Sequence, residues 1–170
     1  MNTHQNFPLE ELSIQDLFNQ EGNTKYEIPI YQRNYAWENE EITALVNDVW
    51  DAYCQSKGTY FIGTLVTYDR GDNRYEVIDG QQRLTTLYLI LKSLDCEVKS
   101  KLTYRSRKRS NDTINKLPIQ EKDNPDLGIL RGFKVVENAI NEIVGTENKE
   151  NFTKYLLAQV HIIHYRVPRD

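Results

Sequence analysis

The stretch YEVIDGQQRLTTLYLILKSL, residues 75–94, joins two apolar patterns around a group of polar residues. Its first residues are rich in β-branched and aromatic side chains, as in a strand. Further along, apolar residues recur at the spacing of a helix that packs on one face, and they are Leu84, Leu87, Tyr88, Leu91 and Leu94. The stretch therefore predicts a strand that turns into a helix near Gly80.

The polar group DGQQR, which begins at Asp79, falls at this predicted junction. The first N–H groups of a helix lack partners inside it, and the helix dipole adds about half a positive charge there. Gly80 allows a tight turn and the approach of a ligand, Gln81 and Gln82 add neutral donors and acceptors, and Arg83 offers a planar fork for phosphate oxygens. Mg²⁺ between Asp79 and a polyphosphate would offset their repulsion. The junction thus has the chemistry of a phosphate site.

A purely structural interpretation fits the same residues. Asp79 and Gln82 have the spacing of a capping box, in which two side chains satisfy the donors of the helix start. Arg83 would then point into solvent.

Gln32 and Arg33 form a second polar cluster, in YQRNYAW, directly before the clearest helix pattern of the chain, residues 40–53. An arginine and backbone donors at that helix start could converge on an anion. Two such clusters around one sheet indicate one cleft. The aromatic residues of this segment either stack on a nucleotide base or act as hydrophobic staples, and they are Tyr31, Tyr35 and Trp37.

The chain has 170 residues and is 39% hydrophobic, which is enough for one domain with its own core. Its formal net charge of -4 means that contact with nucleic acid would need a local basic patch. Because no apolar run approaches the roughly 18 residues of a membrane span and no signal peptide is visible, we expect a cytoplasmic protein. Cys54 and Cys96 are too few for a disulfide framework and are predicted to be buried thiols.

The rest of the chain also shows sequence patterns of helices, strands and turns. We expect a helix capped by Ser13, whose spacing to Asp16 is that of an N-cap, and a β-hairpin over residues 60–79. Pro29 confines the extended segment before YQRNYAW to a sheet edge or a strand end. The second half predicts a strand over KLTYRSRKRS, a helix over DLGILRGFKVVENAINEIVG ending at Gly145, a short helix over KENFTKYLLA and a final strand over QVHIIHYRVP.

Two motifs are excluded as functional sites. In a strand, the offset of three between His161 and His164 puts their rings on opposite faces, which rules out a metal pair. GTYFIGT lacks the lysine that a phosphate-binding P-loop needs after its second glycine.

A basic run remains, and it comprises Lys99, Lys101, Arg105, Arg107, Lys108 and Arg109. Such a run either contacts nucleic-acid phosphates, chiefly through its last four members, or is a solvated strand and turn.

The segments IPIYQRNYAW, YFIGTLV and YEVIDGQQRLTTLYLIL, in this order and spacing, resemble the N-terminal domain family of GmrSD-type restriction endonucleases, also called domain of unknown function 262. The resemblance implies an α/β (α+β) fold of the ParB and sulfiredoxin type, with a small mixed sheet flanked by helices and a helical C-terminal part. It also implies a domain that binds and hydrolyses a nucleoside triphosphate with Mg²⁺ and couples this to restriction of modified foreign DNA.

The family signature falls on Asp79, Gly80, Gln81, Gln82 and Arg83, and its upstream pair falls on Gln32 and Arg33. On this resemblance we expect both arginines to bind phosphate, Gln81 or Gln82 to orient the attacking water, and Asp79 to hold Mg²⁺ or that water. Gly80, Gln32 and Tyr31 complete the expected nucleotide site.

We expect residues 1–98 to form the nucleotide-binding core and residues 99–170 to complete the same domain before a downstream region. Members of the family often continue into an HNH-type nuclease, for which His4, His161 and His164 do not suffice. DNA cleavage by this chain alone is therefore not expected, and a nuclease domain or subunit is an expected partner. The alternatives are a DNA-binding or modification-sensing module without turnover, and a structural domain in which DGQQR is a cap.

Overall fold

The computed structural model describes residues 9–19 and 23–168, and His4 lies outside them. The strands are β1 (Leu9–Ser13), β2 (Lys25–Ile28), β3 (Tyr60–Gly71), β4 (Arg74–Asp79), β5 (Lys101–Tyr104) and β6 (Val160–Val167). The helices are α1 (Ile14–Phe18), α2 (Asn39–Cys54), α3 (Gln81–Ser93), α4 (Lys108–Asn115), α5 (Leu127–Ala139) and α6 (Lys149–Gln159). Short turns of other helix types are η1 (Glu121–Asp123), η2 (Ile140–Val144) and η3 (Thr146–Asn148).

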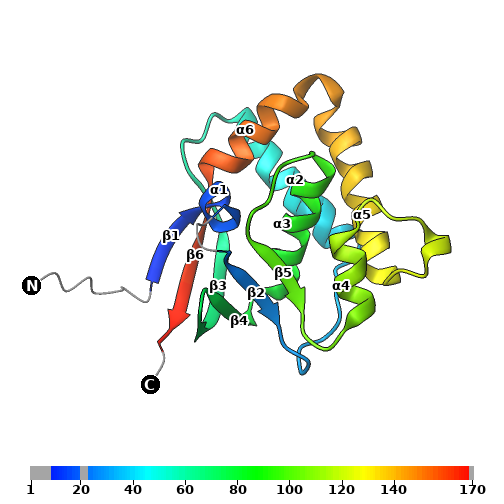
Figure 1. Ribbon diagram of the computed structural model, residues 1–170. Coiled ribbons are helices and arrows are strands. Elements are labelled where there is room, and N and C mark those ends of the chain that lie inside the picture. The colour runs from blue at the N-terminus through cyan, green and yellow to red at the C-terminus, as the bar shows by residue number, and fades with distance from the viewer. Residues whose placement is uncertain (1–8, 20–22, 169–170) are drawn as a thin grey trace, which may run out of the picture.

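The six strands form one mixed sheet in the order β1-β6-β3-β4-β2-β5 (Figure 1). Strand β3 pairs antiparallel with β4 and parallel with β6, and β2 runs parallel to both β4 and β5. Strands β5 and β6, from the second half of the chain, therefore lie in the same sheet as β1–β4. The mixed α/β class expected from the sequence is confirmed.

One face of the sheet carries the core. Tyr26, Leu65 and Val77, from three neighbouring strands, are fully buried on this side. Helix α3 packs against it, and the hydroxyl of Thr85 is hydrogen-bonded to the hydroxyl of Tyr104 on β5 at 2.8 Å. None of the helices in residues 9–19 and 23–168 combines the length with the apolar character that a membrane span requires.

The two strongest helix predictions are confirmed. Helix α2 buries the predicted residues Ile42, Val46 and Val49, and a capping box between Glu38 and Glu41 starts it. Helix α3 follows β4 directly and buries its predicted apolar stripe, except for Leu94, which is partly buried and caps the C-terminal end.

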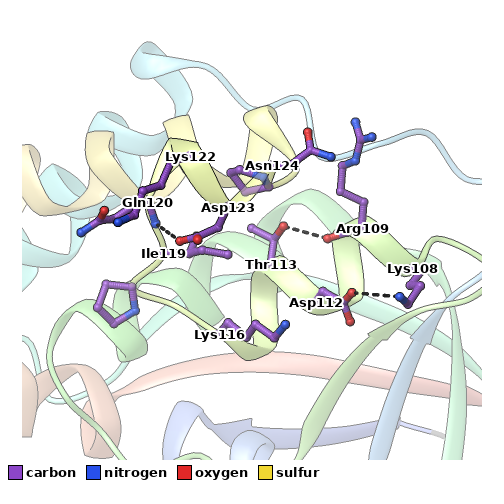
Figure 2. A pocket seen from close by; sticks show the side chains of 12 residues that line it. Lys108, Arg109, Asp112, Thr113, Lys116, Ile119, Gln120, Lys122, Asp123 and Asn124 are labelled. Atoms are coloured by element: carbon purple, nitrogen blue, oxygen red, sulfur yellow. Dashed lines mark hydrogen bonds and ion pairs between the residues drawn. The ribbon is translucent and has the colours of Figure 1, made fainter.

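The prediction of one strand over KLTYRSRKRS is wrong. Only Lys101–Tyr104 is extended, and the following residues form α4, which Figure 2 shows with the ion pair between Lys108 and Asp112. Helix α4 buries Ser110, Thr113 and Ile114. A stripe with a single large apolar residue gives almost no helical periodicity, which explains the error.

Of two further expectations, the helix capped by Ser13 is confirmed and the burial of both cysteines is wrong. The Ser13 side chain accepts the predicted bond from the Asp16 N–H at the start of α1, and residues 9–13 before it form β1. Its partner is β6, which no local pattern near residue 10 can indicate. Cys54 is exposed and Cys96 is only partly buried. Cys54 is the last residue of α2 and lies off its buried stripe.

The final strand places its two histidines on opposite faces, as predicted. His161 bonds to Glu11 on β1 at 2.7 Å, whereas His164 is only 1% exposed and bonds to the Thr67 hydroxyl at 2.8 Å. The other ring nitrogen of His164 is buried without a hydrogen-bond partner. Burial, with the nearby charge of Arg166, lowers the pKa of His164 to about 4.

His164 should make the fold sensitive to acid. The unfolded chain takes up a proton near pH 6.5, whereas the folded chain does so only near pH 4, so stability falls as the pH falls between these values. The loss should reach about 3 kcal/mol. Urea unfolding of His164→Gln should show a flatter pH dependence in this window, and His161→Gln should keep it. An equally steep dependence in His164→Gln would contradict the assignment.

Candidate functional site

Helix α3 begins without a side-chain cap. Its N-cap is Gly80, in the left-handed region at φ 94, and among the described residues no side chain accepts a hydrogen bond from the first-turn N–H groups. The first helical bond runs from the Leu84 N–H to the Gly80 carbonyl at 2.9 Å. The capping-box alternative is therefore wrong. The backbone donors at the positive end of α3 therefore have no side-chain acceptor within the described residues.

Strand β3 lies close to this helix start, and a glycine stands at each of two close contacts. A Cβ on Gly80 would lie 3.0 Å from the Thr64 carbonyl oxygen, and a Cβ on Gly63 would lie 2.5 Å from Nη1 of Arg83. Gly63 has φ 132 and lies where the pairing of β3 with β6 is irregular. The half-buried Arg83 guanidinium thus rests on bare backbone of β3, and it has no hydrogen-bond or ion-pair partner among the described residues.

The two adjacent glutamines have different surroundings. Gln82 accepts a hydrogen bond from the Ala36 N–H at 2.8 Å and donates one to the Asn34 carbonyl at 3.1 Å. Gln81 is 8% exposed, and its Oε1 is buried without a hydrogen-bond partner in residues 9–19 and 23–168. Gln82 therefore holds the neighbouring loop, while Gln81 keeps an unused acceptor at the start of α3.

The structure brings the second polar cluster to this junction. We call residues 30–36 the QR loop. The Gln32 side chain donates to the Ile78 carbonyl, directly before Asp79, at 2.9 Å. Arg107 donates from one guanidinium nitrogen to the carbonyls of Ile30 and Gln32. The QR loop is thus held from the end of β4, from α3 and from the start of α4.

The predicted charged residues of the site remain exposed. Arg33 and Asp79 are exposed, and their side chains form no hydrogen bond or ion pair within the described part of the chain. Both lie next to residues that join the QR loop to the β4–α3 junction, namely Gln32 and Ile78. Arg33 and Arg83 thus extend from two segments that touch, although neither lines the hollows beside α4.

The aromatic residues of the QR loop divide into two groups. Tyr35 is buried and hydrogen-bonded to Thr86, and burial raises the pKa of Tyr35 to about 12. Trp37 packs partly buried against the core. Tyr31 is 69% exposed. Tyr35 and Trp37 are therefore structural, whereas the ring of Tyr31 is open to a ligand.

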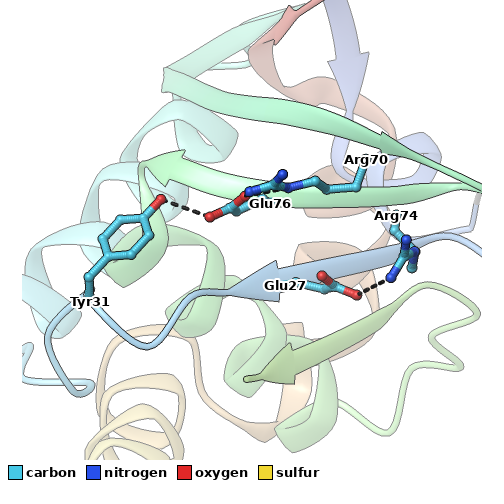
Figure 3. Close-up of polar contacts among 5 residues, drawn as sticks. All are labelled: Glu27, Tyr31, Arg70, Arg74 and Glu76. Atoms are coloured by element: carbon cyan, nitrogen blue, oxygen red, sulfur yellow. Dashed lines mark hydrogen bonds and ion pairs between the residues drawn. The ribbon is translucent and has the colours of Figure 1, made fainter. Parts of the chain in front are cut away.

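A carboxylate on β4 fixes Tyr31. The Tyr31 hydroxyl donates to Glu76 at 2.8 Å, which raises the pKa of Tyr31, and Arg70 forms an ion pair with the same carboxylate (Figure 3). Glu76 is only 5% exposed, so the ion pair compensates a buried charge. Beside it, Arg74 approaches Glu27 at 4.0 Å. The network holds one end of the QR loop against the open face of the sheet.

Three of the four predicted nucleic-acid residues lie together, since Arg107, Lys108 and Arg109 line one hollow beside α4, and the last two also line a second. Arg107 also donates to the QR loop, and Arg105 is exposed and lines neither hollow. Sequence reasoning also missed Gly63 as a residue of the site. A glycine inside a strand often marks the close approach of another group, and this signal could have indicated the contact between Gly63 and Arg83.

A family model described as GmrSD restriction endonuclease, N-terminal domain, matches residues 14–167. The match spans every element of the fold except β1, together with both polar clusters. The fold and its uncapped junction define an α/β domain with a candidate anion site. The chain belongs to the GmrSD N-terminal domain family and so to a restriction system. No curated protein matches it significantly.

The adjacent glutamines should differ in their effect on stability. Gln82→Ala leaves the Ala36 N–H and the Asn34 carbonyl unpaired, and we expect it to lower the free energy of unfolding by about 1–2 kcal/mol. Gln81→Leu removes a buried oxygen that has no partner, so stability should stay within about 1 kcal/mol of the wild type or rise. Urea unfolding measures both. If Gln81→Leu costs as much as Gln82→Ala, Gln81 has a structural role.

Proposed function

We propose that the start of α3 binds the phosphate chain of a nucleoside triphosphate and that the domain hydrolyses it as part of a restriction protein. One combined observation carries the proposal. An uncapped helix start lies beside the buried, unpartnered Oε1 of Gln81 and beside the Arg83 fork, which has no partner within the described residues. Membership of a restriction endonuclease family supports the biological setting.

Binding uses donors that the fold leaves open. The first-turn N–H groups of α3 and the dipole of the helix attract the phosphates. Arg83 adds a bidentate contact, and its position against Gly63 limits the directions that its guanidinium can take. From the QR loop, Arg33 supplies a second charge and Tyr31 a ring for the base. Gln32 positions the loop through its bond to the Ile78 carbonyl.

Hydrolysis needs a water held in line with the terminal phosphate. We assign this role to Gln81, because its Oε1 can accept a hydrogen bond from the water, and we assign loop positioning to Gln82. The water oxygen bonds to the terminal phosphorus as the bond from that phosphorus to the bridging oxygen breaks. The nucleoside diphosphate leaves with the electron pair of the broken bond, and the protons of the water leave with the phosphate product. Arg83 stabilises the charge that develops on the transferred group.

Asp79 fits a role in holding Mg²⁺. It is exposed, its side chain has no partner within the described residues, and it directly precedes the N-cap residue of α3. Residues 9–19 and 23–168 contain no group of three His, Cys, Asp or Glu that could hold a metal alone. One carboxylate together with substrate phosphates and waters is a usual Mg²⁺ arrangement. The ion would supply charge neutralisation on the phosphates.

A module that binds or senses DNA without turnover is the competing function. The basic hollows beside α4 favour it, since they need no nucleotide chemistry. Phosphate release by the purified protein with Mg²⁺ and each triphosphate separates the two functions.

Arg83 should be essential for nucleotide binding. Arg83→Ala should weaken binding of a triphosphate roughly 10–100-fold, since a hydrogen bond to a charged group contributes about 1.5–3 kcal/mol. Gly63→Ala should weaken it as well, because the new Cβ would displace the guanidinium. Arg131→Ala, an exposed site on α5, serves as the charge control. Calorimetric titration gives the affinities, and unchanged binding in folded Arg83→Ala would refute the site.

Gln81 should act on turnover rather than on binding. Gln81→Leu is expected to keep triphosphate affinity within a few fold and to lower the rate of phosphate release at least roughly 100-fold, in the range that lost polar contacts to a transition state cause. Comparing calorimetric affinity with the single-turnover rate tests this split. Normal turnover in Gln81→Leu would show that a residue other than Gln81 orients the water.

A further inference from the structure

A broad hollow separates α4 from the segment that follows it. Its volume is about 980 Å³, and Figure 2 shows side chains of α4 on one side and of residues 119–124 on the other. Its charged lining residues are Lys108, Arg109, Lys116, Lys122, Asp112 and Asp123. A second hollow of about 470 Å³ shares Lys108 and Arg109 and reaches Asn34 of the QR loop. The start of α4 is therefore a ridge between two hollows.

The acidic residues of both hollows are already engaged. Asp112 lies 3.9 Å from the ammonium of Lys108. Asp123 takes part in the capping box of η1 and accepts a hydrogen bond from the Gln120 N–H at 3.4 Å. Asp126, in the second hollow, accepts from the Ser110 hydroxyl and caps α5. Their negative charge is thus partly offset within the protein.

Three basic residues of the larger hollow are not engaged in this way. Arg109, Lys116 and Lys122 form no ion pair with any residue in the described ranges 9–19 and 23–168. This local positive charge contrasts with the formal net charge of -4 for the chain. A surface that concentrates unpaired cations on an acidic protein favours a polyanion.

The dimensions favour a polymer over a single phosphate. Helix α4 has 8 residues, so Arg109 near its start and Lys116 just after its end are separated by about 10 Å along the axis. Phosphates of one DNA strand follow one another every ~3.4 Å of the duplex axis, so this distance spans about three of them. The second hollow extends the path beyond Arg109.

We propose that this ridge and its larger hollow form a docking surface for the phosphate backbone of duplex DNA, with Arg109, Lys116 and Lys122 as its contacts. Lys116 and Lys122 lie outside the basic run of the sequence, and Arg107 is excluded because it holds the QR loop. The contacts are to phosphates, so the surface positions DNA and reads no bases. The proposal does not depend on nucleotide binding at α3.

The test is the salt dependence of binding to a fluorescein-labelled, unmodified 20-base-pair duplex, measured by anisotropy on the full chain. Each phosphate contact contributes about 0.9 to the slope of log affinity against log salt. The triple variant R109A/K116A/K122A should lose about 2.7 of that slope. The control K25A/K57A/K134A removes the same charge from exposed sites that line neither hollow, and it should keep the wild-type slope.

Four results would overturn the proposal. They are an unchanged slope in the triple variant, an equal loss in the control, wild-type binding to single-stranded but not to duplex DNA, and absence of duplex binding at low salt. Triphosphate affinity, measured on the same variants, should stay at the wild-type value. The triphosphate affinity therefore distinguishes a wrong docking surface from a wrong phosphate site at α3. The phosphate site itself is tested by Arg83→Ala.

Discussion

The close approach of α3 to β3 is the constraint on which the candidate site depends. The chain leaves β4 at Asp79 and turns at Gly80 against the backbone of Thr64 and Leu65, where an added Cβ would lie only 3.0 Å from the Thr64 carbonyl oxygen. Two residues past the helix start, the Arg83 guanidinium covers Gly63 of the same strand. Because β3 is also paired with β4 and β6, its position is fixed from both sides. The helix dipole and the arginine therefore face one region.

The DGQQR group combines structural and chemical tasks that its sequence does not separate. Both hydrogen bonds of the Gln82 side chain go to the QR loop, so this loop and α3 form one unit. One residue earlier, the Oε1 of Gln81 is buried and has no hydrogen-bond partner in the described part of the chain. Arg107 extends the unit to α4, where it holds the other end of the loop. A change in position at the start of α4 would thus shift the QR loop. The loop connects the proposed phosphate site at the start of α3 with the proposed docking surface beside α4.

Much of the fold could be predicted because its strongest elements are locally encoded. The stripes of α2 and α3 are regular, and the β3–β4 hairpin has a clear turn, so their order follows from the sequence. Strand β1 could not be predicted, since its pairing with β6 joins residues about 150 positions apart in sequence. Helix α4 was missed because Ser110 and Thr113 replace apolar residues in its buried stripe.

The candidate site could also be predicted only in part from the sequence. The residues of both polar clusters were identified, and the contact between them follows from hydrogen bonds such as that of Gln32 with the Ile78 carbonyl. Their division of roles was not visible, because Gln81 and Gln82 differ only in which backbone groups lie within reach. The role of Arg107 in holding the QR loop could not be predicted, because Arg107 lies in a basic run and such a run is the expected pattern for phosphate contacts.

The most direct test of the site is an NMR titration of the ¹⁵N-labelled protein with Mg²⁺ and a non-hydrolysable triphosphate. Backbone donors at the start of α3 should respond most, so the largest amide shifts are expected at Gly80–Arg83, with smaller ones at Gly63 and in the QR loop. Shifts confined to α4 and residues 116–125, or no shifts at saturating nucleotide, would contradict a phosphate site at the start of α3.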